Sequence, residues 1–154
     1  MTALYVLLGI AALVVLWAIS VYNRLIRMRN VKDEAWSGID VQLKRRFDLI
    51  PNLMETVKGY AAHEQETFQK VTEARAAVMK SGSILERAQS ENMLSGALKS
   101  LFAVAENYPE LKASTNFLHL QEQLTGLEDD IQMSRRYYNG AARDFNIGIA
   151  TFPA

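Results

Sequence analysis

The chain opens with an apolar segment and continues with apolar positions repeated at helical spacing. Residues from Ala3 to Val21 include no charged side chain. At 1.5 Å per residue a helix of this length extends about 28 Å, close to the hydrocarbon thickness of a bilayer. Trp17 and Tyr22 lie near its carboxyl end, where aromatic rings favour the membrane interface. The pattern predicts a single transmembrane anchor helix at residues 3–21.

A cleaved signal peptide is the alternative interpretation of this segment. Ala18, Ile19 and Ser20 form a weak small-x-small cleavage pattern. However, no Lys or Arg precedes the apolar run, and the run is longer than the 7–15 apolar residues typical of a signal peptide. Both features favour an uncleaved signal-anchor.

Positive charge follows the apolar segment and does not precede it. The cations nearest to the span are Arg24, Arg27, Arg29 and Lys32. The positive-inside rule then places the amino terminus outside and residues 22–149 in the cytoplasm, with the anchor in a bacterial inner membrane. The same four cations are candidates for binding lipid headgroups, although fixing the topology explains them equally well. A periplasmic domain is the alternative if the anchor is misinterpreted.

Apolar residues in the last third of the chain alternate spacings of three and four, as in a coiled coil. They are Phe117, Leu120, Leu124, Leu127, Ile131, Ser134, Tyr138, Ala141 and Phe145. An earlier helix is predicted between Ser83, which forms a capping-box pattern with Glu86, and Pro109, which ends it. Each of these helices has one apolar face that must be buried against other helices.

A further apolar stripe crosses Pro51 without losing its helical spacing. Its members are Trp36, Ile39, Leu43, Phe47, Ile50, Leu53, Val57 and Tyr60. The spacing indicates a kinked, continuous helix. Asn52 followed by Glu55 instead resembles a helix start. An unbroken helix from Ala3 to Met79 would also reach about 115 Å, far longer than the other predicted helices beside which it would pack. We favour a break at Pro51.

These patterns predict an all-α protein: one transmembrane helix followed by an elongated, antiparallel, up-and-down bundle of four helices. The predicted bundle helices lie near residues 23–49, 52–79, 84–107 and 112–146, with a tail at 150–154.

Composition narrows the possible functions. Seventeen basic residues balance seventeen acidic ones, which argues against a nucleic-acid partner. The chain has no cysteine, and neither His63 nor His119 belongs to the Glu-x-x-His motif of di-metal bundles. No phosphate-binding loop or nucleophile motif occurs. We therefore expect no enzymatic activity, no cofactor and no small-molecule substrate, with a carboxylate metal enzyme as a remote alternative.

Three stretches of the sequence resemble the bacterial LemA family. They are "VQLKRRFDLIPNLMETVKGYAAHE" (Val41–Glu64) with Glu73-Ala74-Arg75, "YPELKASTNFLHLQEQL" (Tyr108–Leu124) and "LEDDIQMSRRYYNGAARDFN" (Leu127–Asn146). The resemblance implies a membrane-anchored helical bundle without an accepted enzymatic activity. Some relatives participate in building magnetosome membranes. Family members usually carry a further apolar and aromatic tail after a segment like "TFPA" (Thr151–Ala154).

The polar residues of these stretches form either a buried network or an interaction surface. They are Arg46, Asp48, Asn52, Glu64, Arg75, Asn116, Glu128, Arg135 and Asn139. Arg46, Asn52, Glu64 and Arg135 are the candidate site residues, although polar groups that fix helix register would look the same. We expect a membrane-tethered scaffold or adaptor that self-associates and binds an unidentified membrane or cytoplasmic protein. A membrane-shaping protein is the second hypothesis.

Overall fold

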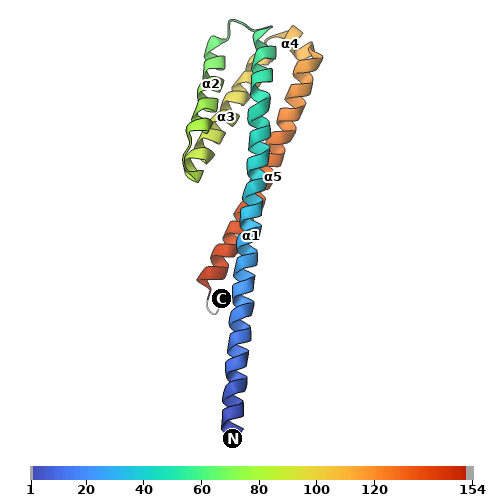
Figure 1. The fold of residues 1–154 in the computed structure, drawn as a ribbon. Helices are drawn as coiled ribbons and strands as arrows, with labels where there is room; N and C mark the ends of the chain where they lie inside the picture. The colour runs from blue at the N-terminus through green and yellow to red at the C-terminus, as the bar shows by residue number, and fades with distance from the viewer. Residues whose placement is uncertain (1, 152–154) are drawn as a thin grey trace. The chain divides into compact units, whose positions relative to one another are not determined.

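The computed structural model describes residues 2–151, and all regular structure in that range is helical (Figure 1). The helices are α1 (Thr2–Lys58), α2 (Gln65–Lys80), α3 (Ile84–Ala105), α4 (Pro109–Ala113) and α5 (Thr115–Ala150). The predicted all-α class is confirmed. The expected number of four bundle helices is not confirmed, because the chain forms an additional short helix, α4, with Pro109 in its first turn.

Helix α1 continues through Pro51, so the predicted break at this residue is wrong. Pro51 is exposed, whereas Ile50 and Leu53 beside it are fully buried. Proline removes one hydrogen bond to the carbonyl of Phe47, four residues earlier. Burial of the apolar face on both sides of Pro51 therefore keeps the helix continuous.

The chain turns after Lys58 instead. Ala61 donates its backbone N–H to the carbonyl oxygen of Val57 at 2.9 Å, and Glu64 donates to Ala61 at 3.2 Å. Ala61 is buried, which fixes the turn against the core. The helix expected at 52–79 therefore begins only at Gln65. Asn52, predicted to start that helix, lies inside α1, where its carbonyl accepts from the Thr56 hydroxyl at 2.9 Å.

The predicted start of α3 is confirmed. Ser83 is the N-cap residue, and its hydroxyl accepts from the backbone N–H of Glu86 at 3.2 Å. The Glu86 carboxylate in turn accepts from the backbone N–H of Ser83 at 3.2 Å. This reciprocal capping box satisfies backbone donors that have no partner inside the helix.

Contacts divide the chain into two compact units, and we describe each by itself. The central unit comprises residues 41–132, and the terminal unit combines residues up to 40 with those from 133 onward. Helices α1 and α5 contribute residues to both units.

The central unit contains the main apolar core, to which every helix contributes. In chain order its buried residues are Ile50, Leu53, Val57, Ala61, Phe68, Val71, Ala74, Leu94, Ala97, Leu98, Leu101, Ala105, Leu111, Phe117, Leu120 and Leu124. The predicted apolar stripe across Pro51 contributes Ile50, Leu53 and Val57 to this core, and the stripe of α5 contributes Phe117, Leu120 and Leu124. Helices α2 and α3 lie side by side as an antiparallel hairpin joined at residues 81–83 (Figure 1). Burial of this face supplies the main favourable free energy of folding.

In the terminal unit α1 and α5 pair in antiparallel fashion. The ring centroids of Trp36 and Tyr138 lie 5.3 Å apart at an interplanar angle of 59°. The Lys32 ammonium lies 5.2 Å from the centroid of the Phe145 ring. In these two contacts the residue number increases along α5 while it decreases along α1, so the two helices run in opposite directions.

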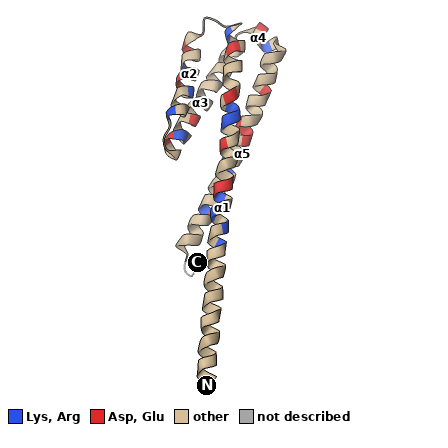
Figure 2. Cartoon of the chain, in the orientation of Figure 1, with Lys and Arg blue, Asp and Glu red and all other residues tan. Residues whose placement is uncertain are grey.

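The first part of α1 has the length and composition of a membrane span. It is the one such segment among the described residues, with a mean hydropathy of 2.6 over its best window and no buried residue there. Figure 2 shows that charged residues begin only beyond this segment. An exposed apolar helix of this kind suits a membrane anchor.

Candidate functional site

A buried arginine connects three helices of the central unit. Arg46 of α1 has an exposed fraction of 0%. Its Nη1 donates to Ser95 Oγ of α3 and to Glu128 Oε2 of α5, each at 2.6 Å. Its Nη2 donates to the backbone oxygen of Glu91 at 3.2 Å and pairs with the Glu91 carboxylate. We call Arg46, Glu91, Ser95 and Glu128 the Arg46 network.

The network contains one buried cation and two carboxylates of unequal exposure. The Glu91 side chain is 2% exposed, whereas that of Glu128 is 35% exposed. Ser95 Oγ donates to Glu128 Oε1 at 2.8 Å, and Arg87 Nε lies 3.7 Å from Glu91 Oε1. Because unpaired buried charges are costly, this arrangement holds only when α1, α3 and α5 keep their register.

Positions within the apolar stripes explain why these polar side chains meet. Arg46 follows Leu43 by three residues and precedes Ile50 by four, so it faces the core. Glu91 precedes Leu94 by three residues on α3. Sequence reasoning selected Arg46 and Glu128 but missed Glu91 and Ser95. The sequence signal that could have identified Glu91 as a buried residue is its position, as a carboxylate, on the apolar face of α3.

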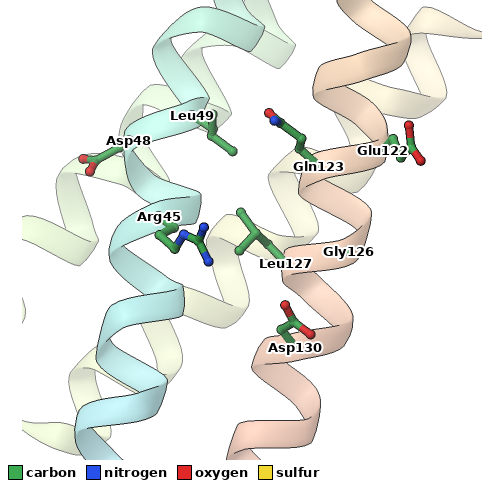
Figure 3. Close-up of a pocket in the computed structure, with 8 residues that line it drawn as sticks. All are labelled: Arg45, Asp48, Leu49, Glu122, Gln123, Gly126, Leu127 and Asp130. Carbon is green, nitrogen blue, oxygen red and sulfur yellow. The ribbon is translucent and has the colours of Figure 1, made fainter.

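A groove of about 450 Å³ runs between α1 and α5 within the central unit. Its lining residues, shown in Figure 3, are Arg45, Asp48, Leu49, Glu122, Gln123, Gly126, Leu127 and Asp130. Arg45, Leu49 and Leu127 point into the space between the helices, while Asp48 and Glu122 point outward (Figure 3). We call this the α1/α5 groove. It combines an apolar floor with an edge that is mostly acidic.

A second groove, of about 480 Å³, lies between α3 and α5 in the same unit. Leu98, Phe102 and Leu124 supply its apolar lining. Ser95 and Glu128 also line it, so the most exposed carboxylate of the Arg46 network opens into this α3/α5 groove. Helix α5 is therefore flanked by a groove on either side.

The other candidate residues have separate surroundings. Glu64, half-buried before α2, accepts a hydrogen bond from the Tyr108 hydroxyl at 3.0 Å. That hydrogen bond to a carboxylate raises the pKa of Tyr108, because it stabilises the protonated phenol. Asn52 is exposed, and Arg135 is half-buried in the terminal unit. Among the four, only Arg46 belongs to the buried network.

Other polar residues of the stretches that resemble the LemA family make structural contacts in the central unit. The Arg75 guanidinium lies 4.2 Å from the centroid of the Phe47 ring. Asn116 Nδ2 donates to Thr56 Oγ1 at 3.1 Å. These contacts connect α2 and α5 to α1 and help to fix helix packing. Asn139 is exposed in the terminal unit.

The cations that follow the apolar segment lie largely in solvent. Arg24, Arg27 and Arg29 are exposed, and Lys32 is half-buried. Arg29 and Lys32 approach Asp33 at 3.8 and 3.2 Å. Arg24 and Arg27 form no ion pair within residues 2–151.

Metal-ligating side chains do not gather within residues 2–151, where no group of three His, Asp or Glu residues is placed to hold an ion. His63 and His119 are both exposed. His119 Nε2 lies 3.2 Å from the Gln123 amide nitrogen.

Fold and site together define an all-helical protein that has a candidate membrane anchor and a buried polar network among its helices. The chain belongs to the LemA family, whose sequence pattern matches residues 35–154. It is 34% identical over 134 residues to the protein LemA of Metamycoplasma hominis, covering 84% of this chain and 60% of that relative.

Magnetosome proteins are also similar to this chain. It is 26% identical over 158 residues to the magnetosome protein MamQ 2 of Paramagnetospirillum magneticum, covering 86% of this chain and 58% of that protein. The magnetosome protein MamQ of Magnetospirillum gryphiswaldense is 24% identical over the same length, with the same coverage. The chain thus spans about 60% of the length of the curated relatives it matches.

Proposed function

We propose that this protein is a non-enzymatic, membrane-tethered scaffold or adaptor that binds a partner protein along α5. The observation that carries the proposal is the Arg46 network, which fixes α1, α3 and α5 around the two grooves. A groove whose walls keep their spacing binds a partner with a smaller entropic cost than a mobile surface does.

The α1/α5 groove is the preferred partner site. Its charged lining consists of one basic residue, Arg45, and three acidic residues, Asp48, Glu122 and Asp130. Leu49 and Leu127 provide apolar area. Such a lining complements an amphipathic helix that carries basic residues beside an apolar stripe. Gly126 leaves space in the groove for a partner side chain, because a Cβ at this position would meet no atom within 4 Å.

The proposed setting is a bacterial inner membrane, with the amino terminus outside and the bundle in the cytoplasm. The support is the distribution of charge, because Arg24, Arg27, Arg29 and Lys32 all follow the apolar segment. Many copies tethered to one surface also meet at high effective concentration, which favours self-association.

A second candidate function is membrane shaping. Similarity to magnetosome proteins and the exposed arginines after the apolar segment favour it. Vesicles containing the protein, with and without anionic lipid, would test this function. Unchanged vesicle shape in both would contradict it.

Site-specific photo-crosslinking in native membranes tests the scaffold proposal. A photoreactive residue at Gln123, in the α1/α5 groove, should capture a discrete protein. The matched control is Leu118, an exposed position on the same helix outside the lining of either groove. Equal capture from both positions, or capture from neither, would contradict the proposal. Capture of a second copy from Gln123 would identify self-association as the interaction.

A further inference from the structure

The end of α5 returns to the part of α1 that directly follows the apolar segment. A Cβ added at Gly148 would lie 3.1 Å from Met28 Sδ and 3.4 Å from Leu25 Cδ2, so the backbone of α5 closely approaches these side chains. Phe145, one turn earlier, lies beneath the Lys32 ammonium. All these residues belong to the terminal unit.

Helix geometry places this contact at the level of the lipid headgroups. Leu25 and Met28 follow Val21 by four and seven residues, a rise of about 6–10 Å. The polar layer on each side of a bilayer is about 5–8 Å thick. Gly148 therefore lies at the outer edge of that layer when the apolar segment spans the membrane, and Thr151 lies deeper.

The side chains at this end of α5 suit such a position. No charged residue occurs between Phe145 and Thr151, whereas Arg143 and Asp144 form an ion pair just before them. Ile147 and Ile149 are each 55% exposed although both are large and apolar. Burying such side chains in the interface gains about 25 cal/mol per Å² of apolar area removed from water.

Cations occur at the same level on α1. Arg24 and Arg27 are exposed and form no ion pair within residues 2–151. Helix α5 carries no basic residue in its own last turn. The basic residues at this level of the terminal unit therefore come from α1, and each such cation adds about 1 kcal/mol of attraction to an anionic surface.

We propose that residues 145–151 form a second membrane-contacting segment, which inserts into the headgroup layer of an anionic bilayer beside α1. Ile147 and Ile149 contact the outer part of that layer, and Arg24 and Arg27 bind its phosphate groups. This proposal requires only that the apolar segment spans a bilayer, and it does not depend on the scaffold function. Two contacts in place of one would hold the helix pair upright on the membrane.

Absence of cysteine from the chain makes a direct test available, because each introduced cysteine can be labelled alone. The full chain is reconstituted into phosphatidylcholine vesicles with and without phosphatidylglycerol. An environment-sensitive fluorophore is attached to Ile147→Cys or Ile149→Cys, and quenching by lipid-borne nitroxides is compared with quenching by aqueous iodide. Met133→Cys, exposed on the same helix, is the water-facing control, and Leu8→Cys is the control for membrane insertion.

The expected result is a ratio of lipid to aqueous quenching that is several-fold higher at residues 147 and 149 than at residue 133. The ratio should fall in neutral vesicles, and Arg24→Gln with Arg27→Gln should lower it in anionic vesicles. Circular dichroism of each variant verifies that the helices remain intact.

Three outcomes would overturn the proposal. In the first, residues 147 and 149 are as accessible to iodide as residue 133 while the residue 8 label is quenched from the lipid. In the second, both labels are shielded from both quenchers in proportion to protein density, which would assign this face to a second copy. In the third, lipid quenching is absent at residue 8 as well as at residues 147 and 149, which would show that the apolar segment does not span the bilayer.

Discussion

The guanidinium of Arg46 and the carboxylate of Glu91 form an ion pair that is almost completely shielded from solvent. The pair connects α1 to α3, and the bond from Arg46 Nη1 to Glu128 at 2.6 Å adds α5. Charges in such surroundings stabilise a fold only as a set, because removing one partner leaves the other buried and unpaired.

Replacing Arg46 by methionine should therefore strongly destabilise the protein. We expect Arg46→Met to lower the free energy of unfolding by about 3–5 kcal/mol, measured by denaturant titration in detergent. The double variant with Glu91→Met should lose less than the single variant, since the buried Glu91 carboxylate is gone and the remaining Glu128 side chain is 35% exposed. The neighbouring, exposed Arg45 provides the control, and Arg45→Met should change stability by no more than about 0.5 kcal/mol. Equal effects at the two positions would contradict the network's role.

Substitution of Pro51 by alanine should stabilise α1. The helix already has continuous geometry at this residue, so alanine restores the hydrogen bond to Phe47 without moving the backbone. We expect a gain of about 1–3 kcal/mol in the free energy of unfolding, seen as a higher thermal midpoint. A loss of stability would show instead that the proline sets a bend on which the packing of Ile50 and Leu53 depends.

The hydrogen bond between Tyr108 and Glu64 should make stability depend on alkaline pH. Because the folded state raises the pKa of Tyr108, its contribution is complete below the unfolded value of about 10. That contribution is lost as the pH rises through the folded pKa. The difference in thermal midpoint between wild type and Tyr108→Phe should therefore shrink above about pH 10. Tyr137→Phe, at an exposed tyrosine, should show no such dependence.

Enlarging Gly148 should separate the end of α5 from α1. A Cβ there would meet Met28 Sδ at 3.1 Å and Cε at 3.3 Å, contacts that a flexible methionine can adjust for alanine but not for valine. Gly148→Val should therefore speed amide hydrogen exchange in residues 145–150. A matched Gly140→Val variant, at a site where a Cβ meets nothing within 4 Å, should leave the exchange in residues 145–150 unchanged. Normal protection in Gly148→Val would mean that this helix contact contributes little stability.

Local rules that act within a few residues were sufficient to predict much of the fold. The capping box at Ser83 and Glu86 located the start of α3, because both partners lie within one turn. The apolar stripe from Phe117 to Ile131 identified the buried face of α5, because burial follows the helical repeat directly. The apolar segment of α1 was evident for the same reason.

Features decided by long-range packing were not predictable in the same way. At Pro51 the local preference for a helix break was overridden by burial of Ile50, Leu53 and Val57 on the opposite face. The partner of Arg46 could not be identified because Glu91 lies 45 residues away, on a helix whose rotation only the assembled core determines. The grooves beside α5 depend on the same assembly, so no single stretch of sequence encodes them.

Arg46 and Glu128 are separated by 82 residues along the chain. At synthesis rates of about 5–20 residues per second, the glutamate is made about 4–16 s after the arginine. The apolar segment is complete before either residue, so a bilayer can receive it while Arg46 is still hydrated. Burial of the arginine requires α5, so the central unit can close only after the apolar segment has been synthesised.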